Sequence, residues 1–221
     1  MATSVGAAQG TSPHAGESKL LAWVIQHRKA VIWGALILLL AAGAFAWNLF
    51  STRQSERVAS QQLSSARFAF ESKNYALAAS ELSRIAENYS GSRSADEASI
   101  LLAQTRLAQG QSQQAIDVLK QFAPKASADY RAQAYGLLGA AYENVGHPKE
   151  AAEAYEEASK NGRLPFERAQ FLSDAGRAWL AARDTGRAVA AYQEIVSKLD
   201  STGSAFEAKV RLGELQTGAN K

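Results

Sequence analysis

The chain has 221 residues, no cysteine and a formal net charge of +3 at pH 7. Because cysteine is absent, disulfide bridges, thiol nucleophiles and thiolate metal sites are excluded. A nearly neutral chain offers no electrostatic basis for binding nucleic acid, so that class of partner is not expected.

Residues 1–28 are predicted to form a disordered tail. The first 18 of them, MATSVGAAQGTSPHAGES, are mostly small or polar and include three glycines. A segment of this composition buries too little apolar surface to offset the entropy that is lost on ordering.

Residues 29–50 are predicted to form a transmembrane helix. From Ala30 to Phe50 there are 21 residues without a charge, and a helix of that length spans about 30 Å, the thickness of a bilayer's hydrocarbon core. Trp33 and Trp47 lie near the two ends, where indole rings favour the headgroup boundary. Gly34 and Ala30 form a small-xxx-small pair that could seat a second helix, although plain lipid-facing surface is the commoner explanation.

Two alternatives to a retained membrane anchor remain open for this segment. A helix buried in a protein core normally carries a polar stripe, which this segment lacks. A cleaved signal peptide is suggested by Ala44–Phe45–Ala46, which mimics a cleavage site. However, the apolar run exceeds the ~7–15 residues that are usual for such a peptide, and a long tail precedes it.

The flanking cations predict how the chain is oriented. Arg28 and Lys29 directly precede the apolar run, whereas Arg53 is separated from its end by two polar residues. The positive-inside rule therefore favours an N-terminus in the cytoplasm and the rest of the chain on the other side. No Gly or Pro occurs between Phe50 and Asn74, which leaves open whether the membrane helix continues into the next helix.

Residues 51–216 contain an internal repeat, seen best in residues 132–165. Residues four apart, such as Leu138 and Tyr142, share one helix face. Small residues fall where two antiparallel helices must approach closely, and Gly146 allows the chain to leave the first helix before Pro148 opens the second. The repeat positions in this stretch are Tyr135, Leu138, Gly139, Tyr142, Gly146, Ala151, Tyr155 and Ala158.

The second half of this pattern recurs at spacings of 36 or 37 residues, which predicts about four helix pairs. The recurring triplets are Ala78, Leu82 and Ile85; Ala115, Leu119 and Phe122; and Ala188, Tyr192 and Ile195. Ser94 with Glu97, and Ser204 with Glu207, match the capping box that begins a helix. The second of these opens a final helix, 204–216, that is expected to cap the stack. Residues 217–221 are expected to be a short tail.

These positions resemble the tetratricopeptide repeat family. The resemblance implies an all-α fold, in which a single N-terminal transmembrane helix is followed by a TPR-like α-solenoid of about four helix pairs and a C-terminal capping helix. Helix pairs of this kind cannot bury their apolar faces alone and stack on their neighbours.

No arrangement of residues typical of catalysis is found in the sequence. The three histidines are scattered, and no H-E-x-x-H, G-x-S-x-G or G-x-x-x-x-G-K motif is present. The many glutamates on predicted amphipathic helices are typical of solvated faces. We therefore expect no enzyme activity, no cofactor and no bound metal.

The concave face of the stack is the candidate binding site. In repeat proteins, the first helices of successive pairs line a groove that holds an extended peptide or a partner helix. Any one of these residues, taken alone, is more often ordinary surface. The candidates are Glu97, Gln104, Gln133, Glu143, Asn144, Gln170 and Arg177.

The order of tail, membrane helix and repeat domain resembles a bacterial inner-membrane family of ancillary Sec-translocon subunits. That resemblance implies a single-pass protein whose C-terminal domain is periplasmic and whose partners are membrane-complex subunits, exported proteins or periplasmic chaperones. The alternative is an accessory structural subunit of another large inner-membrane complex, respiratory or photosynthetic, held through its membrane helix. Substitutions at Arg177 and Asn144 should weaken partner capture only in the first case.

Overall fold

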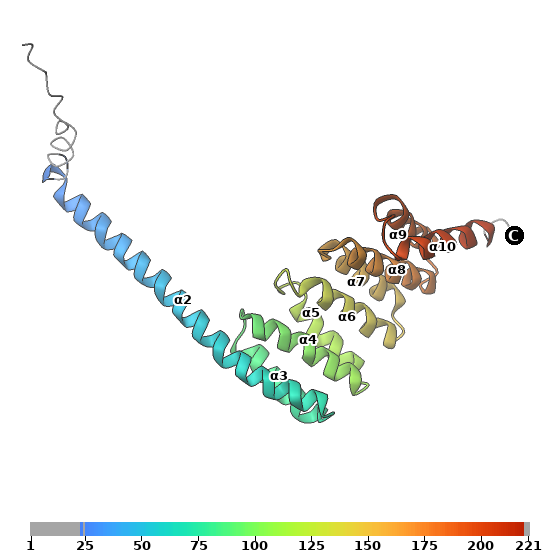
Figure 1. The fold of residues 1–221 in the computed structure, drawn as a ribbon, viewed down its shortest axis with the longest axis horizontal. Helices are drawn as coiled ribbons and strands as arrows, with labels where there is room; N and C mark the ends of the chain where they lie inside the picture. The colour runs from blue at the N-terminus through green and yellow to red at the C-terminus, as the bar shows by residue number, and fades with distance from the viewer. Residues whose placement is uncertain (1–22, 24, 219–221) are drawn as a thin grey trace, which may run out of the picture. The chain divides into compact units, whose positions relative to one another are not determined.

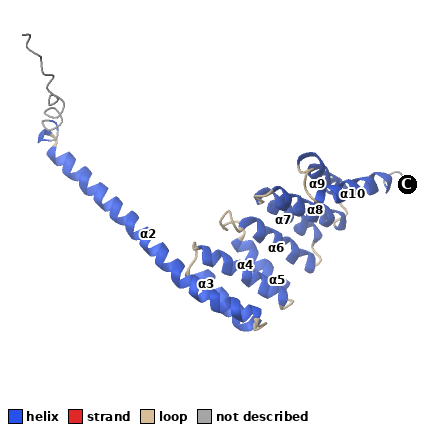
Figure 2. Cartoon of the chain, in the orientation of Figure 1, coloured by secondary structure: helices blue, strands red, loops and turns tan. Residues whose placement is uncertain are grey.

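The computed structural model describes residue 23 and residues 25–218 of the chain. The predicted tails, 1–28 and 217–221, therefore lie mostly outside the described residues. The chain divides into two units, residues 1–52 and 53–221. Within the described residues the secondary structure is helical, with turns and no strand (Figures 1 and 2). The labelled helices are α2 (Arg28–Glu71), α3 (Tyr75–Asn88), α4 (Arg93–Ala108), α5 (Ser112–Phe122), α6 (Arg131–Asn144), α7 (Pro148–Asn161), α8 (Pro165–Ala181), α9 (Thr185–Lys198) and α10 (Ser204–Gly218).

The first unit contains the N-terminal part of α2. In the described part of the chain, no helix combines the length and apolar character needed to cross a membrane, so the transmembrane helix predicted over residues 29–50 is not found there. The large apolar side chains described in this unit are exposed to between 45% and 74% of their surface. They are Trp23, Ile25, Ile32, Trp33, Leu36, Ile37, Leu38, Leu39, Leu40, Phe45, Trp47 and Phe50.

The second unit is a stack of helix pairs. Residues 53–71 of α2 pack with α3, and α4 with α5, α6 with α7 and α8 with α9 follow in chain order, each packed on the next (Figure 1). Helix α10 packs on α9 and α8 at the C-terminal end. This is the predicted solenoid, with the final helix beginning at Ser204 as the sequence predicted.

The repeat positions form the core, as predicted. The four equivalent alanines, Ala78, Ala115, Ala151 and Ala188, are each 0% exposed. At Gly139 an added Cβ would lie 2.7 Å from the ring of Tyr155. At Gly176, which is equivalent to Gly139, it would lie 2.6 Å from the ring of Tyr192. A glycine at each position therefore lets an aromatic ring of the second helix lie directly on the first.

The turn inside each repeat needs one residue in the left-handed region. These residues are Lys73, Gly110, Gly146 and Arg183, with φ of 60°, 72°, 74° and 62°. The predicted role of Gly146 in ending a helix is confirmed. The first and last repeats place a residue with a side chain in this conformation, which glycine adopts at lower cost.

One predicted helix start is wrong. Ser92, not Ser94, caps α4, because the Ser92 side chain accepts a hydrogen bond from the backbone N–H of Ala95. The Ser94 hydroxyl instead donates to Glu56 of α2 at 2.6 Å. Its supposed capping partner, Glu97, forms an ion pair with Arg67 of α2. Because both side chains bind residues of α2, neither of them caps α4.

Candidate functional site

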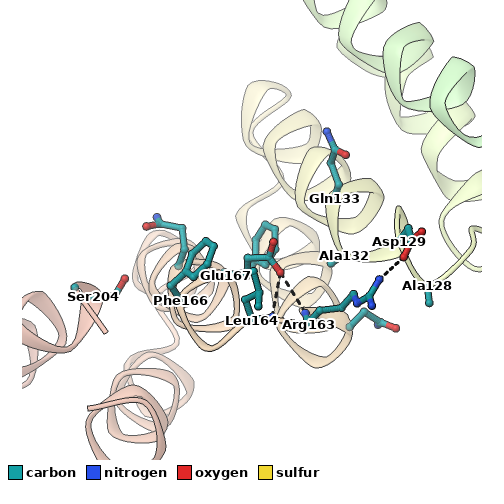
Figure 3. A pocket seen from close by; sticks show the side chains of 13 residues that line it. Ala128, Asp129, Ala132, Gln133, Arg163, Leu164, Phe166, Glu167 and Ser204 are labelled. Atoms are coloured by element: carbon teal, nitrogen blue, oxygen red, sulfur yellow. Dashed lines mark hydrogen bonds and ion pairs between the residues drawn. The ribbon is translucent and has the colours of Figure 1, made fainter. Parts of the chain in front are cut away.

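A hollow of about 860 Å³ lies on the second unit where several inter-repeat turns meet (Figure 3). The first turn of α6, the turn between α7 and α8, the first half of α8 and the start of α10 contribute to it. We call it the loop-end hollow. Its lining residues are Ala128, Asp129, Ala132, Gln133, Asn161, Arg163, Leu164, Phe166, Glu167, Gln170, Phe171, Gly203 and Ser204.

Three large side chains give the loop-end hollow an apolar surface. Leu164 is 46% exposed and Phe166 is 60% exposed, although both are strongly apolar. Phe171 is partly buried, and its ring lies against α6, where a Cβ added at Gly136 would be 2.5 Å away. Exposed apolar side chains gathered around one hollow are typical of a surface that binds another molecule.

The charged groups around the loop-end hollow are already engaged by other groups of the chain. Arg163 forms an ion pair with Asp129 (Figure 3). One carboxylate oxygen of Glu167 accepts hydrogen bonds from the backbone N–H groups of Arg163 and Leu164, both at 3.2 Å, and so caps α8. The hollow therefore presents apolar surface and carboxamides, such as those of Gln133 and Gln170, beside the hydrogen-bonded carboxylate of Glu167.

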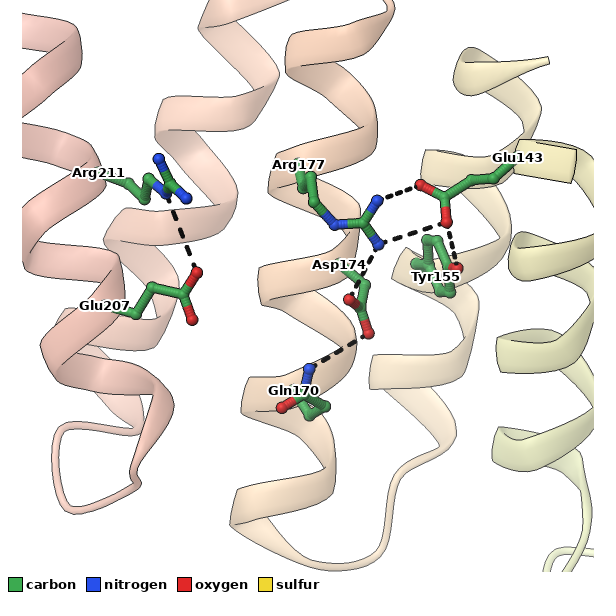
Figure 4. Close-up of polar contacts among 7 residues, drawn as sticks. All are labelled: Glu143, Tyr155, Gln170, Asp174, Arg177, Glu207 and Arg211. Carbon is green, nitrogen blue, oxygen red and sulfur yellow. Dashed lines mark hydrogen bonds and ion pairs between the residues drawn. The ribbon is translucent and has the colours of Figure 1, made fainter. Parts of the chain in front are cut away.

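A polar cluster crosses from α6 to α8 (Figure 4). The Arg177 guanidinium donates to both carboxylate oxygens of Glu143, at 2.5 and 3.3 Å, and to Asp174 at 3.2 Å. The Tyr155 hydroxyl donates to Glu143 at 2.9 Å. Gln170 donates to Asp174 at 3.4 Å, which links this cluster to a residue that lines the hollow.

This environment shifts two pKa values in the direction expected. Burial, and then the hydrogen bond to Glu143, raise the pKa of the Tyr155 hydroxyl above its ordinary value. The hydrogen bond that Arg177 donates to Glu143 is the largest influence that raises the pKa of Arg177, so its guanidinium stays charged at every accessible pH. The charged groups of this cluster bind one another across α6 and α8. The cluster therefore has a structural role, which is to join neighbouring repeats.

The seven predicted groove residues have different surroundings. Gln133 and Gln170 line the loop-end hollow, and Glu143 and Arg177 bind each other. Glu97 contacts Arg67 and lies 3.5 Å from the Tyr130 hydroxyl. Gln104 is half-buried on α4, and Asn144 is exposed at the end of α6. Their role in binding a partner stays a prediction, as does an anchoring role for Trp33, Gly34 and Trp47.

Leu164 and Phe166 were not among the residues predicted from the sequence. These residues flank the proline that begins α8, and a pair of large apolar residues next to a turn signal could have been noticed. Asp129, which pairs with the neighbouring Arg163, lies 34 residues before it in the sequence, and the stacking of the repeats brings the two together. Among the described residues, no group of three or more His, Asp or Glu side chains is placed to hold a metal ion.

Comparison with known proteins identifies the repeats. The family model of the tetratricopeptide repeat-like domain matches residues 58–172, slightly more than half of the chain. The chain therefore belongs to this family, as its repeat pattern predicted.

Solved structures with the same fold include two crystal structures of the "putative kinesin light chain nearly identical TPR-like repeats" of Podosopora anserina, one of them a variant with a single substitution. Each is 20% identical, with a TM-score of 0.56, and covers 75% of this chain and 88% of that chain. At this identity the likeness shows the fold alone. No curated protein sequence matches the chain. Repeats of this family typically form protein-interaction scaffolds.

Proposed function

We propose that this chain is a protein-interaction adaptor that is held at the bacterial inner membrane and binds uncharged, apolar segments of partner proteins in the periplasm. The loop-end hollow is the observation that carries the binding part of this proposal. It joins exposed Leu164 and Phe166 to carboxamides that can bond to the backbone of an extended peptide.

The charged side chains that line the hollow already have partners within the chain, which favours an uncharged ligand. Arg163 is paired with Asp129, and one carboxylate oxygen of Glu167, which keeps its negative charge, accepts hydrogen bonds from two backbone N–H groups. A charged peptide would lose hydration on entering the hollow, and each ionic partner that it gained there would first have to give up a contact within the chain. An apolar segment gains mainly by burying surface against Phe166 and Leu164.

Attachment to the membrane is supported by the uncharged sequence from Ala30 to Phe50 and by Arg28 and Lys29 directly before it. The exposure of the large apolar side chains described in this segment, including Trp33 and Trp47, also supports it. Placing the repeat domain in the periplasm beside the Sec translocon follows the resemblance of the whole arrangement to ancillary translocon subunits.

Fluorescence anisotropy with the full chain in mild detergent tests the binding part. The probes are three labelled 12-residue peptides that share two leucines and are otherwise uncharged, acidic or basic. We expect the uncharged peptide to bind best and its affinity to change by less than about twofold between 0.05 and 0.5 M NaCl. Phe166→Ser should weaken it about tenfold. Phe68→Ser, at a phenylalanine that is 71% exposed on α2, is the matched control.

A preference for the acidic or basic peptide, or equal binding by the Phe166 and Phe68 variants, contradicts the binding part.

Alkaline carbonate extraction tests the membrane part, because an anchored chain stays with the lipid pellet and a peripheral chain is released. Protease added to spheroplasts should digest residues 53–221. A photocrosslinking amino acid in place of Phe166 should then capture translocon subunits or exported proteins, whereas capture of respiratory subunits would favour the alternative complex.

A further inference from the structure

The last helix of the stack, α10, has apolar residues on two opposite faces. Its inner face packs on the C-terminal core and is formed by Ala205, Ala208, Leu212 and Leu215. Its outer face contains Phe206, which is 77% exposed, and Val210, which is 45% exposed. A terminal helix of a repeat stack requires a polar outer face for solubility, because no further repeat covers it. Helix α10 does not meet this requirement.

The outer face of α10 follows the spacing of a coiled coil. Phe206, Val210, Gly213 and Thr217 alternate by four and three residues, which places them on one stripe of the helix. Phe206 and Val210 provide two apolar side chains that can insert between residues of a facing helix. A Cβ added at Gly213 would meet nothing within 4 Å, so a second helix can approach there closely.

The charges beside this stripe specify what can face it. Lys209 lies on one side of the stripe, whereas Glu207 and Glu214 lie on the other, and all three are exposed. Glu207 and Glu214 share Arg211, at 3.9 and 3.1 Å, and Lys209 has no ion pair within the described residues. The sequence of this one helix therefore carries opposite charges on opposite flanks of an apolar seam.

These flanks match a second copy of the same helix in parallel. In a parallel pair, the residue at the Lys209 position faces the residue five places further along the other helix, which is Glu214. Two-fold symmetry forms this contact twice. In an antiparallel pair, like flanks meet, so Glu207 of one copy would face Glu214 of the other and repel it.

We propose that α10 pairs in parallel with α10 of a second copy, which makes the chain a two-fold symmetric homodimer. The seam consists of Phe206 and Val210, and Lys209 and Glu214 select the parallel orientation. Since α10 is already folded on α9 and α8, pairing does not incur the cost of helix formation. The proposal goes beyond the adaptor function and does not depend on the loop-end hollow.

Sedimentation equilibrium of the full chain in mild detergent tests the dimer. Phe206→Gln should raise the dimer dissociation constant at least about tenfold. Phe68→Gln, which removes a similarly exposed phenylalanine from α2, should leave it unchanged. Lys209→Glu should raise the constant about fivefold, and the double variant Lys209→Glu, Glu214→Lys should return it to within about twofold of the original.

Disulfide trapping tests the orientation, because the natural chain contains no cysteine. Thr217→Cys should crosslink to itself in a parallel pair, since equivalent residues meet across the two-fold axis. An antiparallel pair instead places residue 217 beside residue 206 of the other copy and gives no such crosslink. A monomer at all concentrations, a dimer that is indifferent to Phe206→Gln, or a charge exchange that fails to restore pairing overturns the proposal.

Discussion

At the residue scale, one position in the turn inside each repeat has a left-handed backbone in all four repeats, but glycine occupies it in only two of them. Gly110 and Gly146 adopt a positive φ without a side-chain penalty, whereas Lys73 and Arg183 adopt it with a Cβ. The repeat pattern of the sequence located these turns. The pattern could not show that the backbone stays left-handed at this position when glycine is absent. Backbone hydrogen bonds formed in the folded turn, such as that from Arg183 N–H to Leu180 O, hold the residue in this conformation.

We predict that Lys73→Gly stabilises the second unit. The substitution removes the steric cost of φ 60°, and the larger entropy of glycine in the unfolded chain offsets part of the gain, which leaves about 0.5–1 kcal/mol. The midpoint of urea unfolding measures the effect. The converse variant, Gly146→Ala, should destabilise by about 1 kcal/mol. A destabilised Lys73→Gly chain would show that the lysine side chain contributes a contact there.

The raised pKa of Tyr155 predicts how the free energy of unfolding changes at alkaline pH. Burial raises the pKa of its hydroxyl above the ordinary value of 10.0, so the folded chain holds this proton more tightly than the unfolded chain. The stabilisation is full below the unfolded pKa of about 10 and is lost as pH rises above it. We expect the urea midpoint to fall above pH 10 and to fall less steeply in Tyr155→Phe. Identical slopes in the two proteins would contradict this assignment.

At the element scale, the helices and their apolar faces were predictable because their signals are local. Ala115, Leu119 and their equivalents are spaced so that one helix face becomes buried, whatever lies further along the chain. The start of α4 was predicted wrongly because Ser94 and Glu97 bind α2 instead. The loop-end hollow could not be predicted either, since Phe166 and Asp129 approach only after the repeats have stacked.

The third and fourth repeats are joined by acid–arginine contacts at a constant separation. Arg163 contacts Asp129, Arg177 contacts Glu143 and Arg187 contacts Glu153, each 34 residues apart in sequence. A double-mutant cycle of Glu143→Gln and Arg177→Gln should give a coupling energy of about 1 kcal/mol, because the contact is bidentate and Glu143 is largely covered.

The contact between Arg187 and Glu153 is the control for this cycle. Its closest atoms are 3.9 Å apart, and both side chains are about half exposed. The equivalent cycle should therefore give less than about 0.5 kcal/mol. Equal coupling energies at the two sites would show that geometry does not decide the strength of these contacts. The result also measures how much the contact of Arg177 contributes to the stability of the stack.

At the scale of the whole molecule, the core of the second unit is divided rather than continuous. One cluster lies between α2 and α4, a second is centred on α4 to α7, and a third extends from α7 to α10. Each repeat contacts mainly its neighbours, so a local defect should open one end of the stack before the rest unfolds.

Gly176→Ala provides that local defect, because its Cβ would lie 2.6 Å from the ring of Tyr192. We predict that amide hydrogen exchange accelerates at least about tenfold in α8, α9 and α10, since Tyr192 must leave its position on α8. Exchange in α3 and α4 should change by less than about twofold, because their cluster contains no residue of the last repeat. Gly186→Ala, whose added Cβ on α9 would meet only Asp184 Oδ1 at 3.7 Å, is the matched control. Uniform acceleration from α3 to α10 would mean that the three clusters unfold as one cooperative unit.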